Sequence, residues 1–151
     1  MKILVTFYSR TGNTKKVGEE IAKILKADID QIIDEKDRKG LKGYFGGGKD
    51  ALMKNKSRIK YDKKPESYDL VIIGTPVWAG TMAPAVRTYL SENKFEKVAF
   101  FCTYGSGFSR AFSDMEKITR KPVATFGIGQ IKVKSGEYSQ EIEDFCKKLM
   151  K

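Results

Sequence analysis

The stretch Ile3-Leu4-Val5-Thr6-Phe7-Tyr8-Ser9-Arg10-Thr11-Gly12-Asn13-Thr14 decides the predicted fold. Residues 2–8 are apolar and β-branched, which predicts a buried strand, and residues 9–14 form a polar turn. A helix is predicted next, because one helical face collects Val17, Ile21, Ile24 and Leu25. A strand that passes through a turn into a helix is the repeating unit of an α/β sheet.

The same alternation of strands and helices continues along the chain. Further strands are predicted at 28–33, 69–74, 97–102 and 122–128. Further helices are predicted near 83–92, 109–119 and 138–150, with Pro84 in a first helical turn. Strands that are apolar throughout are typical of a parallel sheet covered on both faces. The sequence therefore predicts an α/β three-layer sandwich with a five-stranded parallel sheet in the order 2-1-3-4-5.

Length and composition favour one domain spanning residues 1–151, with a mass of 17.0 kDa and 40% hydrophobic residues. No apolar run approaches the roughly 18 residues of a membrane span, and we expect no signal peptide. Cys102 and Cys146 form no CxxC, so reduced thiols and a cytoplasmic location are expected. The sequence contains no histidine, which excludes Ser-His catalysis and histidine metal sites.

Positive charge is concentrated in residues 34–64. The chain carries +10, and 11 Lys/Arg against 5 Asp/Glu place +6 of it in this basic insert. The insert is predicted to hold the second helix and a long mobile loop, with Tyr44 and Phe45 between glycines. Three roles stay open for residues 40–49: a lid over a ligand, a docking loop for a partner, or a solvated basic loop.

Three predicted loops, at 9–14, 75–80 and 103–108, should meet at the carboxyl edge of the sheet, where ligands bind in such folds. The first loop combines a glycine, an amide and three hydroxyls with a helix N-terminus, a combination that suits a phosphate. It matches neither a Walker A motif nor GxGxxG. The alternative interpretation is a polar turn with an Asn or Thr helix cap.

The motif Tyr8-Ser9-Arg10-Thr11-Gly12-Asn13-Thr14 resembles the flavodoxin signature T/S-x-T-G-x-T. The resemblance continues at Gly74-Thr75-Pro76-Val77-Trp78 and at Thr103-Tyr104-Gly105-Ser106-Gly107, and it covers most of the chain. It implies an FMN cofactor whose phosphate is held by Ser9, Arg10, Thr11, Gly12, Asn13 and Thr14. It also implies a flavin pocket formed by Thr75, Pro76, Val77, Trp78, Ala79 and Gly80 and by Thr103, Tyr104, Gly105, Ser106, Gly107 and Phe108.

Individual roles also follow from the resemblance. Trp78 is expected to stack on the flavin ring, with Tyr104 or Phe108 as a second wall. Gly80 is expected to allow a peptide flip as flavin N5 gains a proton. Core or interface packing is the alternative for Trp78, and Cys102 is expected to be buried and inert.

This chain departs from typical flavodoxins, which are acidic and carry carboxylates around the flavin. Residues 75–80 and 103–109 contain no Asp or Glu, whereas Arg10 and Arg110 lie close by in sequence. Fewer negative charges should stabilise the anionic reduced flavin. We therefore expect a semiquinone/hydroquinone potential less negative than in acidic flavodoxins.

The leading functional prediction is an FMN-binding electron-transfer protein that shuttles electrons through semiquinone and hydroquinone states to an acidic redox partner. It needs no catalytic side chain and no metal. The first alternative is a flavodoxin-like reductase that uses NAD(P)H or quinone. The second is a basic binding module without flavin, although nucleic-acid contact is not expected because Lys-rich faces are usually only solvated.

Overall fold

The main sheet has the predicted topology. The computed structural model describes residues 1–36, 38, 40–52, 55–107 and 110–151. Within them, parallel strands follow the order β2-β1-β5-β7-β8, which corresponds to 2-1-3-4-5. The strands are β1 (Ile3–Phe7), β2 (Asp28–Gln31), β5 (Leu70–Trp78), β7 (Val98–Tyr104) and β8 (Thr125–Gly129).

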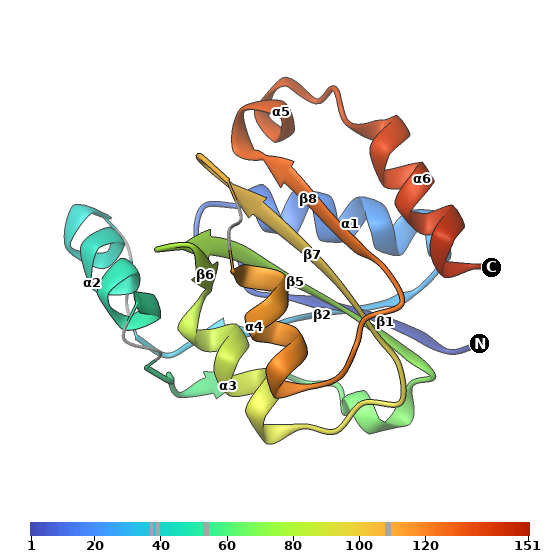
Figure 1. The fold of residues 1–151 in the computed structure, drawn as a ribbon, viewed down its shortest axis with the longest axis horizontal. Helices are drawn as coiled ribbons and strands as arrows, with labels where there is room; N and C mark the ends of the chain where they lie inside the picture. The colour runs from blue at the N-terminus through green and yellow to red at the C-terminus, as the bar shows by residue number, and fades with distance from the viewer. Residues whose placement is uncertain (37, 39, 53–54, 108–109) are drawn as a thin grey trace.

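Helices cover both faces of this sheet. The α-helices of the described residues are α1 (Asn13–Leu25), α2 (Gly40–Leu52), α3 (Pro84–Glu92), α4 (Ala111–Ile118), α5 (Gln130–Ser135) and α6 (Ser139–Leu149). Figure 1 shows α1, α5 and α6 on one face and α3 and α4 on the other. Neighbouring strand residues serve opposite faces: Val5 shares a core cluster with Ile21 of α1, whereas Leu4 shares one with Tyr89 of α3. No helix in the described ranges is long and apolar enough to cross a membrane.

The predicted strand at 28–33 is two strands. The Ile32 N–H donates to the Phe7 carbonyl at 2.8 Å, and the chain then leaves the main sheet. Residues Ile33–Asp34 form β3, which pairs antiparallel with β4 (Ile59–Lys60). A short 3₁₀ helix, η1 (Pro65–Ser67), leads into β5.

The predicted loop at 75–80 is a β-hairpin. Strand β5 continues to Trp78 and pairs antiparallel with β6 (Thr81–Met82). Ala79 and Gly80 have φ angles of 50° and 79°, the sign that a two-residue type I′ turn requires at both positions. Pro84 lies in the first turn of α3, as predicted. The fifth strand begins at residue 125 rather than 122, and α5 is a helix that the sequence did not predict.

The helix predicted within residues 34–64 is present as α2, but it occupies residues 40–49, where a loop was predicted. Each of the three consecutive glycines at 46–48 costs a helix up to about 1 kcal/mol relative to alanine. Packing compensates, since α2 contacts β5, β6 and α3. Figure 1 shows α2 projecting beyond the carboxyl end of β5.

Candidate functional site

The three predicted loops meet at the carboxyl edge of the sheet and enclose a cavity of about 140 Å³. Its lining comprises Arg10, Thr11, Asn13, Thr14, Pro76, Val77, Trp78, Thr103, Tyr104, Gly105 and Gln130. Among the described residues, no carboxylate lines this cavity. The site therefore combines uncharged hydrogen-bonding groups, one arginine and two aromatic rings.

The first loop presents backbone donors at the N-terminus of α1. The Ser9 hydroxyl accepts hydrogen bonds from the N–H groups of Gly12 at 3.1 Å and Lys15 at 3.2 Å, and so shapes the loop from outside the cavity lining. Gly12, with φ of 97°, makes the turn into the helix. Within the described chain, the N–H groups of Thr11, Asn13 and Thr14 donate to no protein acceptor. Together with the helix dipole, these N–H groups favour an anion.

A hydrogen bond joins the first loop to the end of β7. The hydroxyls of Thr14 and Thr103 lie 2.7 Å apart and are buried. One hydroxyl accepts from the other, so one proton remains available to a second acceptor. This contact fixes the spacing of two of the three loops.

Trp78 lies at the end of β5, where Arg38 and Tyr8 pack around its indole ring. The Arg38 guanidinium carbon lies 5.7 Å from the centroid of the indole, and the Tyr8 ring meets the indole edge-on with centroids 5.5 Å apart. Burial, followed by the Asp34 carboxylate, raises the pKa of Tyr8 to about 12, so this ring stays neutral. These neighbours leave part of the indole to line the cavity.

The hairpin tip is anchored to α4. The Gly80 carbonyl accepts from the Arg110 N–H at 2.8 Å, and the buried Thr81 hydroxyl donates to the Asp114 carboxylate at 2.6 Å. Burial lowers the pKa of the neighbouring Arg87 guanidinium, an effect that Asp114 opposes. Ala79 and Gly80 thus form an anchored turn beside the cavity and do not line it.

Several predicted site residues lie outside the cavity lining. Thr75 has no exposed surface, and its hydroxyl donates to the Pro76 carbonyl and accepts from the Ala83 N–H. Ser106 and Gly107 are exposed in the third loop. Phe108 lies outside the described residues.

Cys102 is fully buried, and burial raises the pKa of its thiol to about 12.

Comparison with known proteins identifies the architecture. No family model and no curated protein sequence matches this chain. Among solved structures, a Lactobacillus acidophilus flavoprotein in complex with FMN is 24% identical, with a TM-score of 0.69 over 89% of this chain and 97% of that one. Two-electron reduced Megasphaera elsdenii flavodoxin is 17% identical, with a TM-score of 0.60 over 97% and 99% of the two chains. This chain has the flavodoxin-like fold. A Streptococcus flavodoxin shares it at 13% identity, with a TM-score of 0.58 over 99% of this chain and 98% of that one.

Sequence reasoning missed one residue of the cavity in this flavodoxin-like fold. Gln130 begins α5, directly after β8, and its side chain lines the cavity beside Gly105. The signal was its place after the fifth strand, because the carboxyl ends of all the strands share one edge of the sheet.

Sequence reasoning also missed a buried ion cluster that holds α2 in place. Arg38 donates to Asp34 at 2.7 Å, to Asp50 of α2 at 2.9 Å and to Ser57 at 2.8 Å. Burial alone would lower the pKa of Arg38, but its hydrogen bonds to the two carboxylates raise it. The Arg10 guanidinium donates to the carbonyls of Arg38 at 2.7 Å and Gly40 at 2.9 Å. The first loop is thereby tied to the start of α2.

Proposed function

We propose that this protein binds FMN and works as an electron carrier. The observation that carries the proposal is the cavity itself, where three loops gather uncharged donors and aromatic rings and where no described lining residue is a carboxylate. The fold is shared with a flavoprotein solved in complex with FMN. When bound, FMN supplies the electron chemistry, and the protein supplies binding, orientation and electrostatics.

The first loop fits the phosphate of FMN. A phosphate needs hydrogen-bond donors and favours the positive end of a helix dipole. The N–H groups of Thr11, Asn13 and Thr14, the Thr14 hydroxyl and the Asn13 amide supply those donors. Arg10 adds a positive charge at the cavity lining.

The other two loops fit an aromatic ring system. Trp78 and Tyr104 provide flat apolar surfaces, and Pro76 and Val77 extend them. The cavity of about 140 Å³ is smaller than the roughly 300–1,000 Å³ of sites that enclose a whole ligand. Part of the FMN would therefore stay open to solvent and to a partner, as an electron carrier requires.

The test is retention of flavin by the purified protein. Absorbance near about 370 and 450 nm, expected of a bound oxidised flavin, should survive desalting after FMN is added. Riboflavin, which lacks the phosphate, should bind at least tenfold more weakly. A colourless protein that rejects both flavins would refute the proposal.

A matched pair of variants locates the phosphate. Asn13→Asp places a carboxylate in the first loop and should reduce FMN affinity at least tenfold while leaving riboflavin affinity nearly unchanged. Gln140→Glu makes the same amide-to-acid change on the exposed face of α6 and should change neither affinity. If the two variants changed FMN affinity equally, the first loop would not be the phosphate site. If the FMN-loaded protein alone oxidised NAD(P)H at steady state, the protein would be a reductase and not an electron carrier.

A further inference from the structure

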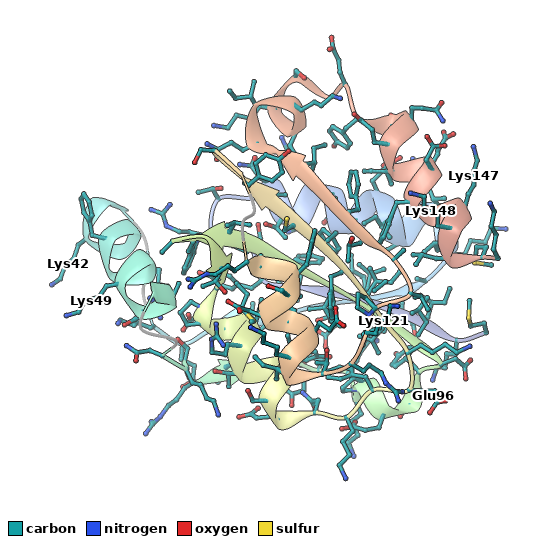
Figure 2. The ribbon with its side chains drawn as sticks, in the orientation of Figure 1. Lys42, Lys49, Glu96, Lys121, Lys147 and Lys148 are labelled. Carbon is teal, nitrogen blue, oxygen red and sulfur yellow. The ribbon has the colours of Figure 1, made fainter. Side chains whose placement is uncertain are left out.

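The outer face of α2 carries a cluster of exposed residues that the candidate site does not use. Lys42, Phe45 and Lys49 follow i, i+3, i+7 spacing, so at 100° per residue they share one side of the helix. Phe45 is 69% exposed, an unusual position for a phenyl ring. Figure 2 shows Lys42 and Lys49 extending from α2 away from the sheet.

We propose that this outer face of α2 is the docking surface for an acidic one-electron redox protein, an inference that rests on the proposed carrier function. Lys42, Phe45 and Lys49 form the centre of the surface. The phenyl ring would enter an apolar depression on the partner, and the lysines would face its carboxylates.

The position of α2 beside the candidate flavin site supports the proposal. The opposite side of the helix carries Gly43, Gly47 and Ala51, which are all buried, and a Cβ at Gly47 would touch the Trp78 ring. Trp78 lines the cavity. A partner on the outer face would thus be separated from Trp78 by about one helix diameter, roughly 10 Å. In transfer, the redox centre of the partner would be oxidised by one electron, and the bound flavin would be reduced by that electron.

Charge selects an acidic partner over a basic one. Two carboxylates of the described residues, on and beside α2, are paired within the protein: Asp34 pairs with Arg38, and Asp50 pairs with Arg38 and Lys36. Within the described residues, Lys42 and Lys49 make no ion pair, so their charges remain directed at solvent. The surrounding residues 34–64 add to a net +6. Such a field accelerates and orients association with a negative surface.

The test is the binding of a plant-type [2Fe–2S] ferredoxin, used as an acidic probe, by titration calorimetry. The double variant Lys42→Glu/Lys49→Glu should weaken binding at least tenfold. The matched control Lys121→Glu/Lys148→Glu has the same net charge, alters two exposed lysines away from α2 (Figure 2), and should weaken binding less than threefold. Added salt should weaken wild-type binding and remove the difference between the variants. If both double variants weakened binding equally, net charge alone would account for the effect, and the proposal would be overturned.

A second pair of variants tests the apolar part. Phe45→Ala should weaken ferredoxin binding at least fivefold, whereas Ile131→Ala, at a residue that is 79% exposed on α5, should leave it unchanged. Self-association seen in sedimentation and abolished by Phe45→Ala would assign the surface to a second copy of this chain and overturn the proposal. Equal binding by both alanine variants would overturn it as well.

Binding is measured with and without FMN, so failure of the carrier function is distinguishable. If the protein retains no flavin yet binds ferredoxin through α2, the docking surface stands and the carrier function falls. If it retains flavin but the α2 variants bind and oxidise reduced ferredoxin like wild type, the carrier function stands and the docking surface falls.

Discussion

The backbone of Gly47 lies directly against the ring of Trp78. A Cβ atom at Gly47 would lie 2.7 Å from Cζ3 and 2.9 Å from Cε3 of the indole, closer than side-chain atoms tolerate. Helix α2 therefore approaches the candidate flavin site through a glycine, and the position of the indole depends on it. Trp78 is also the single tryptophan of the chain, so its fluorescence reports this contact without interference.

We expect Gly47→Ala to displace Trp78 or α2. Overpacking of this kind costs typically about 1–3 kcal/mol. The tryptophan emission should shift to the red as water reaches the indole, and FMN affinity should fall about tenfold. Fluorescence spectra and FMN titrations measure both effects.

Gly48→Ala is the matched control for Gly47→Ala. A Cβ at Gly48 meets nothing within 4 Å. Alanine should therefore stabilise the helix by about 0.5–1 kcal/mol and leave the emission unchanged. If the two alanine variants gave the same emission and FMN affinity, the contact between Gly47 and Trp78 would not position the ring.

Ala79→Gly should stabilise the protein. Ala79 has φ of 50° in the hairpin turn, a left-handed conformation that costs a residue with a Cβ about 1–2 kcal/mol. Part of that gain is lost to the greater freedom of glycine in the unfolded chain. A net gain of about 1 kcal/mol would raise Tm by roughly 2–4 °C. Calorimetry measures it.

Lys26→Gly provides the comparison, because Lys26 has the same φ of 50° at the end of α1, away from the site. It should raise Tm similarly and leave FMN affinity unchanged. A lower Tm for Ala79→Gly would show that its methyl group makes contacts worth more than the strain.

The sequence predicted the central sheet and failed at its periphery, for physical reasons. The strands at 69–74 and 97–102 are continuous apolar runs that only burial on both faces explains, so their assignment was secure. The segment 40–49 contains too many glycines for a helix by propensity, and α2 forms because Trp78 and Arg38 pack against it. Contacts between residues so far apart in sequence leave no local pattern.

In the candidate site too, residues with a local role were predictable from the sequence, and residues placed by tertiary contacts were not. Turn chemistry identified the first loop, because Gly12 and the surrounding polar residues have a local role. The sequence also placed Thr75 in the flavin pocket, whereas in the structure its buried hydroxyl bonds to the backbone of Pro76 and Ala83. Gln130 was missed because a glutamine indicates no binding role by its residue type, so that only its place after the fifth strand pointed to the cavity.

Asp50→Asn should remove a pH dependence from the stability of α2. Hydrogen bonding from Lys36 first, and then from Asn55 and Arg38, holds the pKa of Asp50 well below its usual 3.8. A group with a lowered folded-state pKa contributes stability that is complete above its unfolded pKa and is lost as pH falls through the folded value. Wild type should therefore lose this contribution progressively below about pH 4.

Urea unfolding followed by Trp78 emission measures this dependence at about pH 3 and about pH 6. At the higher pH, Asp50→Asn should be less stable by about 1–3 kcal/mol, since Arg38 and Lys36 lose a charged acceptor. At the lower pH, the difference in the free energy of unfolding between wild type and Asp50→Asn should be smaller. A constant difference would mean that Asp50 titrates normally.

The reduction potential of bound FMN should reflect the missing carboxylates. If FMN is bound, its second one-electron reduction would add negative charge to the flavin, and no carboxylate among the described residues lines the cavity to oppose it. A unit charge at about 4 Å in a medium of dielectric constant about 20 is worth roughly 4 kcal/mol before screening. The potential of this second step should therefore lie above that of an acidic flavodoxin titrated under the same conditions. Gln130→Glu restores one carboxylate to the lining and should lower the potential by about 59 mV or more, a tenfold change in a one-electron equilibrium, whereas Gln140→Glu on α6 should leave it unchanged. An anaerobic redox titration in which wild type matches the acidic flavodoxin would contradict this account, because the charge of the lining would then not set the potential.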